Sequence, residues 1–152
     1  MIIRDILNMK GSAIVSIGPE GTVAQAVGLM VGNDIGSLVV MAGGSMVGML
    51  TFREVLHELD ARGGDLGGVK VAAVMVKDPI VGHPSESVDH LREVMTTNHV
   101  RYLPVKEGDK LLGVISFHDV AKAAINMASF ENRLLKRYIK NWPEDDEPAR
   151  KS

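Results

Sequence analysis

Two short segments of this chain combine a hydroxyl with a carboxylate at a spacing that could bind an anion. In one segment the pair is Ser116 and Asp119, and in the other it is Thr51 and Glu54. An apolar stretch precedes each pair, which predicts a strand that ends at the hydroxyl and runs into a helix. The unpaired backbone N–H groups at such a helix start suit a phosphate, and the hydroxyl adds a donor. The alternative is that these side chains only cap their helices.

The two segments are copies within an internal repeat. Shifting the chain by 65 residues aligns it with itself without a gap and brings ten identical residues into register. The identical pairs are Pro19 with Pro84, Val23 with Val88, Met30 with Met95, Asn33 with Asn98, Leu38 with Leu103, Val40 with Val105, Gly43 with Gly108, Gly48 with Gly113, Phe52 with Phe117, and Val55 with Val120. Because Pro, Phe, Asn and two Gly are among them, we infer a duplication.

Each copy predicts the same order of elements: strand, helix, strand, strand and helix. The first strands are expected at 13–17 and 79–81. The first helices are expected to begin after the N-caps Thr22 and Ser87, because apolar residues follow at helical spacing. We therefore predict an α/β (α+β) fold of two βαββα repeats related by pseudo-twofold symmetry.

The composition along the chain predicts the boundaries of these repeats. Repeat 1 is expected at 3–60, followed by a Gly-rich linker at 61–70 that contains four glycines. Repeat 2 is expected at 71–140 and includes an extended last helix. Pro143 is expected to end that helix, and 141–152 is expected to be a disordered tail.

The composition also argues against several classes of function. The chain has no cysteine, which excludes disulfides, thiolate zinc sites and cysteine nucleophiles. A net charge of -2 without a basic patch argues against nucleic acid as a partner. No signal peptide and no apolar run of membrane-spanning length occur, so we expect a cytoplasmic protein that does not bind membranes. No histidine pair at metal-ligand spacing and no catalytic constellation occur, so we expect neither a metal site nor an enzyme.

Four segments of the sequence resemble the tandem CBS-domain family, also called Bateman modules. They are DIGSLVV at 34–40, VRYLPV at 100–105, GMLTFREV at 48–55 and GVISFHDV at 113–120. The resemblance covers about residues 3–139, and the chain is similar to stand-alone bacterial CBS pairs. It implies a regulatory module that binds an adenosine nucleotide (AMP, ADP, ATP or a related adenosyl ligand such as NAD) in clefts between the repeats. The nucleotide would be a regulatory ligand, and no cofactor would be required.

The resemblance also implies which residues bind the nucleotide. Ser116 would contact the phosphate, and the Asp119 carboxylate would accept hydrogen bonds from both ribose hydroxyls. Side chains of the opposite repeat would enclose the adenine. The residues expected in this cleft are Ala13, Val15, Ile35, Gly36, Val114, Ser116, His118 and Asp119.

A weaker second cleft is expected at the first motif, because Glu54 stands where the family has Asp. The extra methylene changes the reach of the carboxylate and adds a torsion that must be ordered, so a vacant site and a working site both remain open. Arg101 is the best phosphate ligand of the chain, unless it forms a surface ion pair. The residues expected in this cleft are Asp78, Ile80, Val100, Arg101, Thr51, Arg53 and Glu54.

Two hypotheses about function follow. The chain is either a ligand-responsive regulator that signals to an unidentified protein partner, or a scaffold with degenerate clefts that works by dimerisation alone. In both cases we predict a homodimer, because two helices carry more apolar surface than one repeat is expected to bury. The helix residues on which this prediction rests are Val23, Val27, Met30, Val88, Leu91 and Met95. The sequence leaves the preferred ligand and the parallel or antiparallel arrangement of the dimer open.

Overall fold

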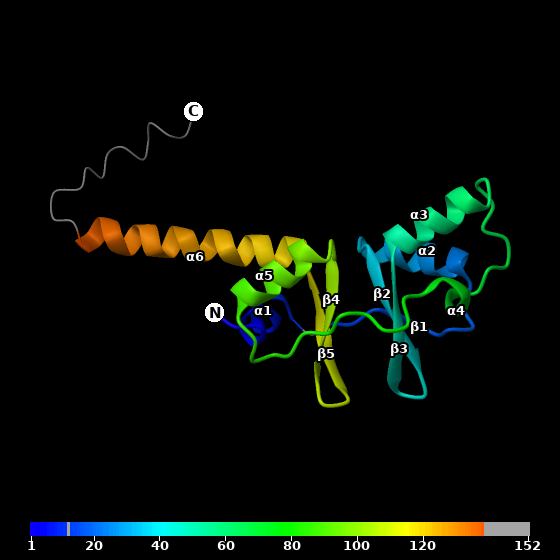
Figure 1. The fold of residues 1–152 in the computed structure, drawn as a ribbon, viewed down its shortest axis with the longest axis horizontal. Helices are drawn as coiled ribbons and strands as arrows, with labels where there is room; N and C mark the ends of the chain where they lie inside the picture. The colour runs from blue at the N-terminus through cyan, green and yellow to red at the C-terminus, as the bar shows by residue number, and fades with distance from the viewer. Residues whose placement is uncertain (12, 139–152) are drawn as a thin grey trace. The chain divides into compact units, whose positions relative to one another are not determined.

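The computed structural model describes residues 1–11 and 13–138 (Figure 1). The chain divides into two compact units, Met1–Val120 and Ala121–Ser152. The first unit holds repeat 1, the part of repeat 2 before its last helix, and the start of that helix, α6 (Phe117–Tyr138). The described part of the second unit is the remainder of α6.

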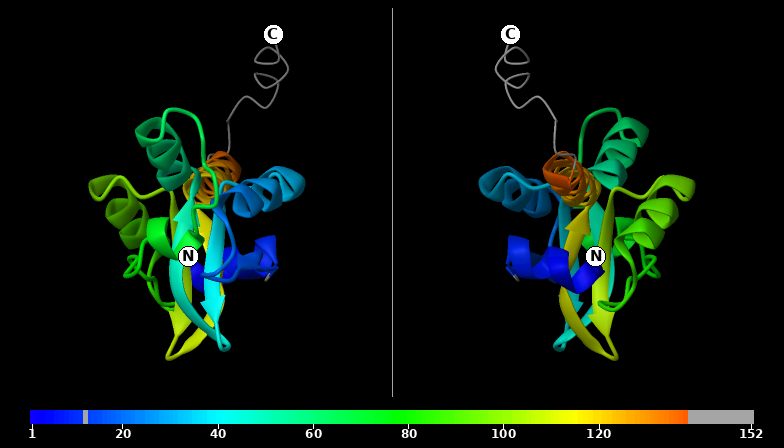
Figure 2. Two further views of the ribbon diagram at one scale, coloured as in Figure 1. Left: turned by 90° about the vertical axis from the view of Figure 1, so that its right-hand side faces the viewer. Right: turned by 90° about the vertical axis from the view of Figure 1, so that its left-hand side faces the viewer.

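The strands of the first unit form two small sheets. In the first sheet, β1 (Ser16–Ile17) runs parallel to β2 (Ser37–Ala42), which pairs antiparallel with β3 (Ser45–Thr51). In the second sheet, β4 (Tyr102–Glu107) pairs antiparallel with β5 (Lys110–Ser116). Because β3 contacts β5, the two hairpins lie side by side, and helices flank them (Figure 2).

The pairing inside the two hairpins repeats residue for residue at the offset of 65. Leu38 lies opposite Leu50 in the first hairpin, and the equivalent pair in the second is Leu103 with Ile115. Each hairpin also has one register shift, and the two shifts lie at equivalent positions. The predicted mixed α/β fold is therefore confirmed, and the duplication extends to the irregularities of the strands.

One predicted strand is wrong. The segment 79–81 forms no strand, because Pro104 of β4 stands at the position of Val39 and has no backbone N–H to donate, whereas Val39 N donates to Val15 O at 3.2 Å in repeat 1. The chain instead makes two isolated bridges on either side of this segment, from Val76 to β3 and from Gly82 to β4. In the first repeat, only the last two residues of the predicted strand 13–17 pair, and they form β1.

Three of the helices in the first unit are α2 (Val23–Asn33), α3 (Phe52–Ala61) and α5 (Val88–Thr97). The Thr22 hydroxyl accepts a hydrogen bond of 3.1 Å from the backbone N–H three residues later, and the Ser87 hydroxyl accepts an equivalent bond of 3.1 Å. Both predicted N-caps are therefore confirmed. The helix α3 follows β3 directly, as α6 follows β5, so each hairpin leads into a helix at its hydroxyl residue.

The short helix that precedes each repeat packs on the other repeat. The helix α1 (Ile3–Lys10) contacts β5, and its first N–H groups donate to the carbonyls of Glu86 and Pro84 at 2.9 Å. The helix α4 (Val71–Val74) contacts α2 and α3, and its first N–H groups donate to the equivalent carbonyls of repeat 1 at 2.8 and 2.9 Å. This exchange ties the two repeats together within the first unit, and the sequence pattern does not predict it.

The core of the first repeat is aliphatic and includes Val71 from the exchanged helix α4. Most helix residues on which the homodimer prediction rests belong to the chain's own interior. Val23 is 0% exposed, Met30 7%, Leu91 2% and Met95 1%. These side chains need no partner subunit to leave water, so that argument for a dimer is wrong, and the dimer itself stays a prediction.

Between α3 and α4 the chain forms turns, in which Gly63, Gly64 and Gly67 adopt positive φ angles. Among the residues that the structure describes, no helix is long and apolar enough to cross a membrane. The tail expected at 141–152 and the end of the expected repeat 2 at 139–140 lie outside the described residues.

Candidate functional site

Ser116 and Asp119 lie where β5 passes directly into α6, and they cap the helix reciprocally. The Asp119 N–H donates to Ser116 Oγ at 3.1 Å, and the Ser116 N–H donates to Asp119 Oδ2 at 2.9 Å. The end of the strand thus places the hydroxyl beside the first N–H groups of the helix. The capping role considered above is present in the structure, and a ligand would have to use the groups that capping leaves free.

The Asp119 carboxylate also has a cationic partner, Lys10, which is the last residue of α1. Lys10 Nζ lies 2.6 Å from Asp119 Oδ2 and donates to Val114 O at 2.7 Å. The side chain of Asp119 is 18% exposed and that of Lys10 is 35% exposed. Partial burial opposes ionisation of Asp119, but the bonds from Lys10 and Ser116 outweigh it and hold the pKa of Asp119 below its ordinary value. Asp119 is therefore negatively charged at neutral pH in a partly enclosed position.

The first motif forms a similar helix start, but its carboxylate has different partners. Glu54 Oε1 accepts hydrogen bonds from both the backbone N–H and the hydroxyl of Thr51, each at 2.8 Å. The Thr51 hydroxyl proton is thus committed to Glu54. Within residues 1–11 and 13–138, no Lys or Arg forms an ion pair with Glu54, and the neighbouring Arg53 is exposed.

Arg101 reaches from the second repeat to the first motif. Its guanidinium carbon lies 5.6 Å from the centroid of the Phe52 ring, which is a cation–π distance, and Phe52 directly follows Thr51. Tyr102 contacts the same ring edge-on, with ring centroids 6.2 Å apart. Among the described residues Arg101 has no ion pair, so its side chain remains available beside the first motif.

The other residues expected around Asp119 are only partly brought together. Val15 and Gly36 make backbone hydrogen bonds within repeat 1, where their carbonyls accept from Val39 N at 3.2 Å and Phe52 N at 2.9 Å. The Val15 side chain packs against the core of that repeat. In the described part of the chain, no hydrogen bond joins Asp119 to the exposed residues Ala13, Ile35 and His118.

Three residues expected in the second cleft serve local structure or face solvent. Asp78 and Ile80 lie in the extended segment between the two isolated bridges, and both are exposed. Val100 is half-buried, and its N–H donates to Met95 O at 2.9 Å at the end of α5. Within the described chain, no group of three or more His, Asp or Glu side chains could hold a metal ion.

Lys10 and Tyr102 are site residues that the sequence motifs do not indicate. Counted from the equivalent helix starts Ile3 and Val71, Lys10 corresponds to Asp78, and at the offset of 65 Tyr102 aligns with Ser37, so neither side chain is shared by the two copies. Lys10 reaches Asp119 because α1 packs on the opposite repeat. The only indication in the sequence is a lysine at the end of the expected first helix, and lysines at helix ends are too common to identify a binding site.

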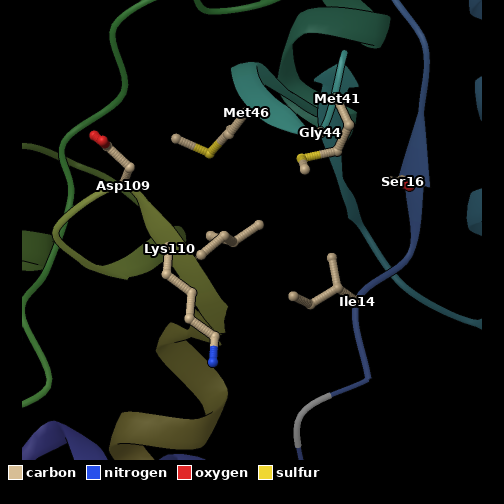
Figure 3. A pocket seen from close by; sticks show the side chains of 8 residues that line it. Ile14, Ser16, Met41, Gly44, Met46, Asp109 and Lys110 are labelled. Atoms are coloured by element: carbon tan, nitrogen blue, oxygen red, sulfur yellow. The ribbon is translucent and has the colours of Figure 1, made fainter.

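A groove of about 360 Å³ lies at the turns of the two hairpins (Figure 3). Both motifs lie at the opposite ends of β3 and β5. It is lined by Ile14, Ser16, Met41, Gly44, Met46, Asp109, Lys110 and Leu111. Ile14 and Ser16 alternate along the chain with the expected binding residues Ala13 and Val15, and alternate residues of an extended chain point to opposite sides. No predicted binding residue lines this groove, so it is not the cleft that the motifs imply.

Comparison with known proteins identifies the family. The CBS domain matches residues 3–61 and 71–126. The CBS domain-containing protein YhcV of Bacillus subtilis (strain 168) is 29% identical over 119 residues, which cover 78% of this chain and 82% of YhcV. The crystal structure of a CBS-domain containing protein from Agrobacterium tumefaciens has a TM-score of 0.78 at 30% identity, and the match covers 82% of this chain and 99% of that protein. The chain therefore belongs to the CBS-domain family.

The comparisons also place the chain in a functional class. A pair of CBS domains is a regulatory module of signal transduction, and this chain is such a pair. The same fold occurs in the CBS domain pair of protein MJ0100, with a TM-score of 0.72, 19% identity and coverage of 84% of this chain and 98% of that one. That domain pair was crystallised in complex with 5'-methylthioadenosine and S-adenosyl-L-methionine.

Proposed function

We propose that this CBS pair binds an adenosine nucleotide at the Ser116–Asp119 helix start and transmits its occupancy to a protein partner. The observation that carries the proposal is the ionised, partly enclosed Asp119 carboxylate, which the Ser116 N–H fixes at the start of α6. Its two hydrogen bonds both end on Oδ2. Oδ1 is therefore available to a ribose hydroxyl, and a bond to an ionised acceptor is a strong one.

The hydroxyl groups of the two motifs support an unequal pair of clefts. Ser116 Oγ accepts from the Asp119 N–H, so the hydroxyl proton of Ser116 remains free to donate to a phosphate. The Thr51 hydroxyl donates to Glu54 instead. A phosphate at the first motif would have to break that bond, so the Ser116–Asp119 cleft is the stronger site. Arg101 would give the first motif a contact for longer phosphate chains.

The ligand class rests on the chemistry of this cleft and on the fold shared with MJ0100, whose domain pair was crystallised with adenosyl compounds. AMP, ADP, ATP and NAD combine the ribose diol that suits Asp119 with a phosphate that suits Ser116 and the helix start. The module would act as a homodimer. Val31 of α2 and Leu56 of α3, which are 76% and 55% exposed, are apolar side chains that such an interface would cover.

The test is a calorimetric titration of the whole chain with AMP, using matched alanine variants of the two carboxylates. Asp119→Ala should weaken AMP binding about 10- to 100-fold, the worth of a hydrogen bond to a charged group, whereas Glu54→Ala should change it little. Circular dichroism of each variant shows whether the fold is retained. A parent chain that binds none of AMP, ADP, ATP and NAD would overturn the proposal. Normal binding by Asp119→Ala with loss in Glu54→Ala would reverse the assignment of the clefts.

The second candidate function is a scaffold that works by dimerisation alone. The observation in its favour is that both motif carboxylates have partners within the chain, Lys10 and Ser116 for Asp119 and Thr51 for Glu54. Sedimentation separates the two functions, because a scaffold would form the same dimer with and without nucleotide and would show no heat of nucleotide binding.

A further inference from the structure

The last residue of the helix α1 contacts the Asp119 carboxylate, which in the proposed function binds the ribose. Its first turn is fixed to repeat 2 by the bonds from Ile3 and Arg4 to Glu86 O and Pro84 O, both 2.9 Å. Nζ of its last residue, Lys10, donates a hydrogen bond of 2.6 Å to Asp119 Oδ2. The second bond of Lys10, 2.7 Å to Val114 O, holds the ammonium against β5 next to the motif. The ammonium is thus part of the cleft although it comes from the opposite end of the sequence.

The hydrogen bonds of Asp119 show that Lys10 and a ribose compete. A carboxylate has about four acceptor positions, two on each oxygen. Lys10 and the Ser116 N–H occupy the two positions on Oδ2. A ribose diol that donates to both oxygens needs one position on Oδ2, and the Ser116 bond belongs to the helix cap. Lys10 is therefore the partner that a ribose diol has to displace when it bridges both oxygens.

In the described part of the chain, the first motif has no such competitor, and the structure gives the reason. The exchanged helix α4 begins with the same pair of backbone bonds as α1, but it ends at Val74, after four residues, whereas α1 continues for eight. Counted from the equivalent first residues Ile3 and Val71, the position of Lys10 corresponds to Asp78, which is acidic. Among the described residues, a cation bonded to the motif carboxylate is therefore specific to the Ser116–Asp119 cleft.

We infer that Lys10 is a specificity-determining residue of this cleft, which selects phosphorylated adenosine ligands over uncharged and cationic adenosyl compounds. The inference rests on the proposed function. Every ligand whose ribose diol bridges the two carboxylate oxygens of Asp119 has to displace the Lys10 ammonium from Oδ2. The outcome then depends on whether the ligand offers the ammonium a new anionic partner.

The 5' substituent of the ligand supplies or withholds that partner. A 5'-phosphate can accept the displaced ammonium, because a lysine side chain has a flexible four-carbon stem and three donors. The thioether of 5'-methylthioadenosine offers no charge, so the displaced ammonium loses its ion pair without a replacement. S-adenosylmethionine has a sulfonium at the position where AMP has its phosphate, so the group nearest the ammonium repels it.

The test measures the ratio of two affinities in three forms of the whole chain. AMP and 5'-methylthioadenosine are titrated calorimetrically into the parent, Lys10→Met and Lys10→Arg. The parent should prefer AMP by about tenfold or more, the value of one hydrogen bond to a charged group. Lys10→Met should reduce that preference about tenfold, with 5'-methylthioadenosine bound as well as or better than by the parent. Lys10→Arg keeps the charge and should keep the preference.

If Lys10 has a purely structural role, Lys10→Met should weaken the binding of both ligands equally and leave the ratio of the two affinities unchanged. That result would overturn the inference and leave the proposed function intact. Absence of binding of both ligands to the folded parent would overturn the inference, and the proposed function would fall as well if ADP, ATP and NAD also failed to bind. If Lys10→Met does not fold, Lys10→Gln provides the same neutral substitution, and its ratio decides in the same way.

Discussion

The Tyr102 hydroxyl lies against Gly36, in the space that a Cβ at position 36 would occupy. The same Cβ would lie 3.0 Å from Cδ1 of Phe52. Gly36 directly precedes β2 of the first repeat, and Tyr102 begins β4 of the second. The absence of a side chain at position 36 therefore allows the two repeats to approach each other at the end where both motifs lie.

Gly36→Ala should destabilise the fold by about 1–3 kcal/mol, the usual cost of an added methyl group in a packed site. Tyr102→Phe removes the closest atom, so the double variant Gly36→Ala with Tyr102→Phe should be less destabilised than the sum of the two single changes. Urea unfolding of the four chains measures this coupling. Additive changes in the free energy of unfolding would show that Gly36 and Tyr102 do not constrain each other.

The equivalent glycines 48 and 113 should differ in their tolerance of alanine. A Cβ at Gly48 would meet the backbone carbonyl of Val76 at 2.7 Å and the Met75 sulfur at 2.9 Å, whereas a Cβ at Gly113 would meet only the tip of Leu7 at 2.9 Å. Val76 is fixed by two backbone bonds to Met49, of 2.8 and 2.9 Å, and cannot move away easily.

We therefore expect Gly48→Ala to lower the free energy of unfolding by about 1–3 kcal/mol and Gly113→Ala by less than about 1 kcal/mol, since a leucine tip can change its rotamer. Thermal unfolding of the two variants side by side compares them directly. Equal losses, or a larger loss for Gly113→Ala, would contradict the prediction.

The sequence predicts the repeated parts of this fold well and the parts outside the repeat poorly. The offset of 65 gives the hairpins, the N-caps Thr22 and Ser87, and the strand-to-helix junctions, because these depend on local patterns that occur twice. The strand expected at 79–81 is wrong because Pro104 of β4 removes a donor where the matching position in repeat 1 is an ordinary residue, Val39. A repeat predicts equivalence, and a single substitution can cancel it locally.

The candidate site shows a related limit. The hydroxyl and carboxylate of each motif are visible in the sequence because their spacing is that of a capped helix start. Lys10 and Tyr102 reach the site from the other repeat, so their contacts depend on how α1 packs and on the small residue at position 36. The apolar helix residues that were expected to form a dimer surface are buried within the chain. The sequence could not show this, because the exchanged helices help to cover the repeats.

Because α1 packs on the second repeat, a substitution in α1 should destabilise the second hairpin more than the first. Leu7 is 8% exposed, and its side chain reaches Gly113 in β5. Leu7→Ala should therefore cost about 2–4 kcal/mol and speed amide hydrogen exchange in β4 and β5 more than in β2 and β3. Hydrogen exchange followed by mass spectrometry resolves the two hairpins. Faster exchange mainly in β2 and β3 would mean that α1 stabilises the repeat to which it belongs in sequence.

The ion pair between Lys10 and Asp119 predicts how stability depends on pH. The pKa of Asp119 is lowered in the folded chain: burial acts against this shift, and the bonds from Lys10 and Ser116 outweigh burial. A carboxylate whose folded pKa lies below its unfolded value stabilises the fold above the unfolded pKa of about 3.9, and this stabilisation is lost as the pH falls through the folded pKa. Lys10 should therefore contribute at neutral pH and lose its contribution in acid.

We expect Lys10→Met to lower the free energy of unfolding by about 0.5–1 kcal/mol between pH 5 and 8, the range for a pair that is still partly exposed. The difference between the parent and the variant should shrink below about pH 4, where Asp119 in the variant and then in the parent becomes protonated. Arg4→Gln on the same helix is the matched control, because the Arg4–Glu107 pair, at 3.2 Å, is about half exposed on both sides and should contribute less. Urea unfolding followed by circular dichroism from pH 3 to 8 provides the comparison. A difference that stays constant or grows on acidification would show that Lys10 stabilises the fold through the packing of its stem and not through the charge of Asp119.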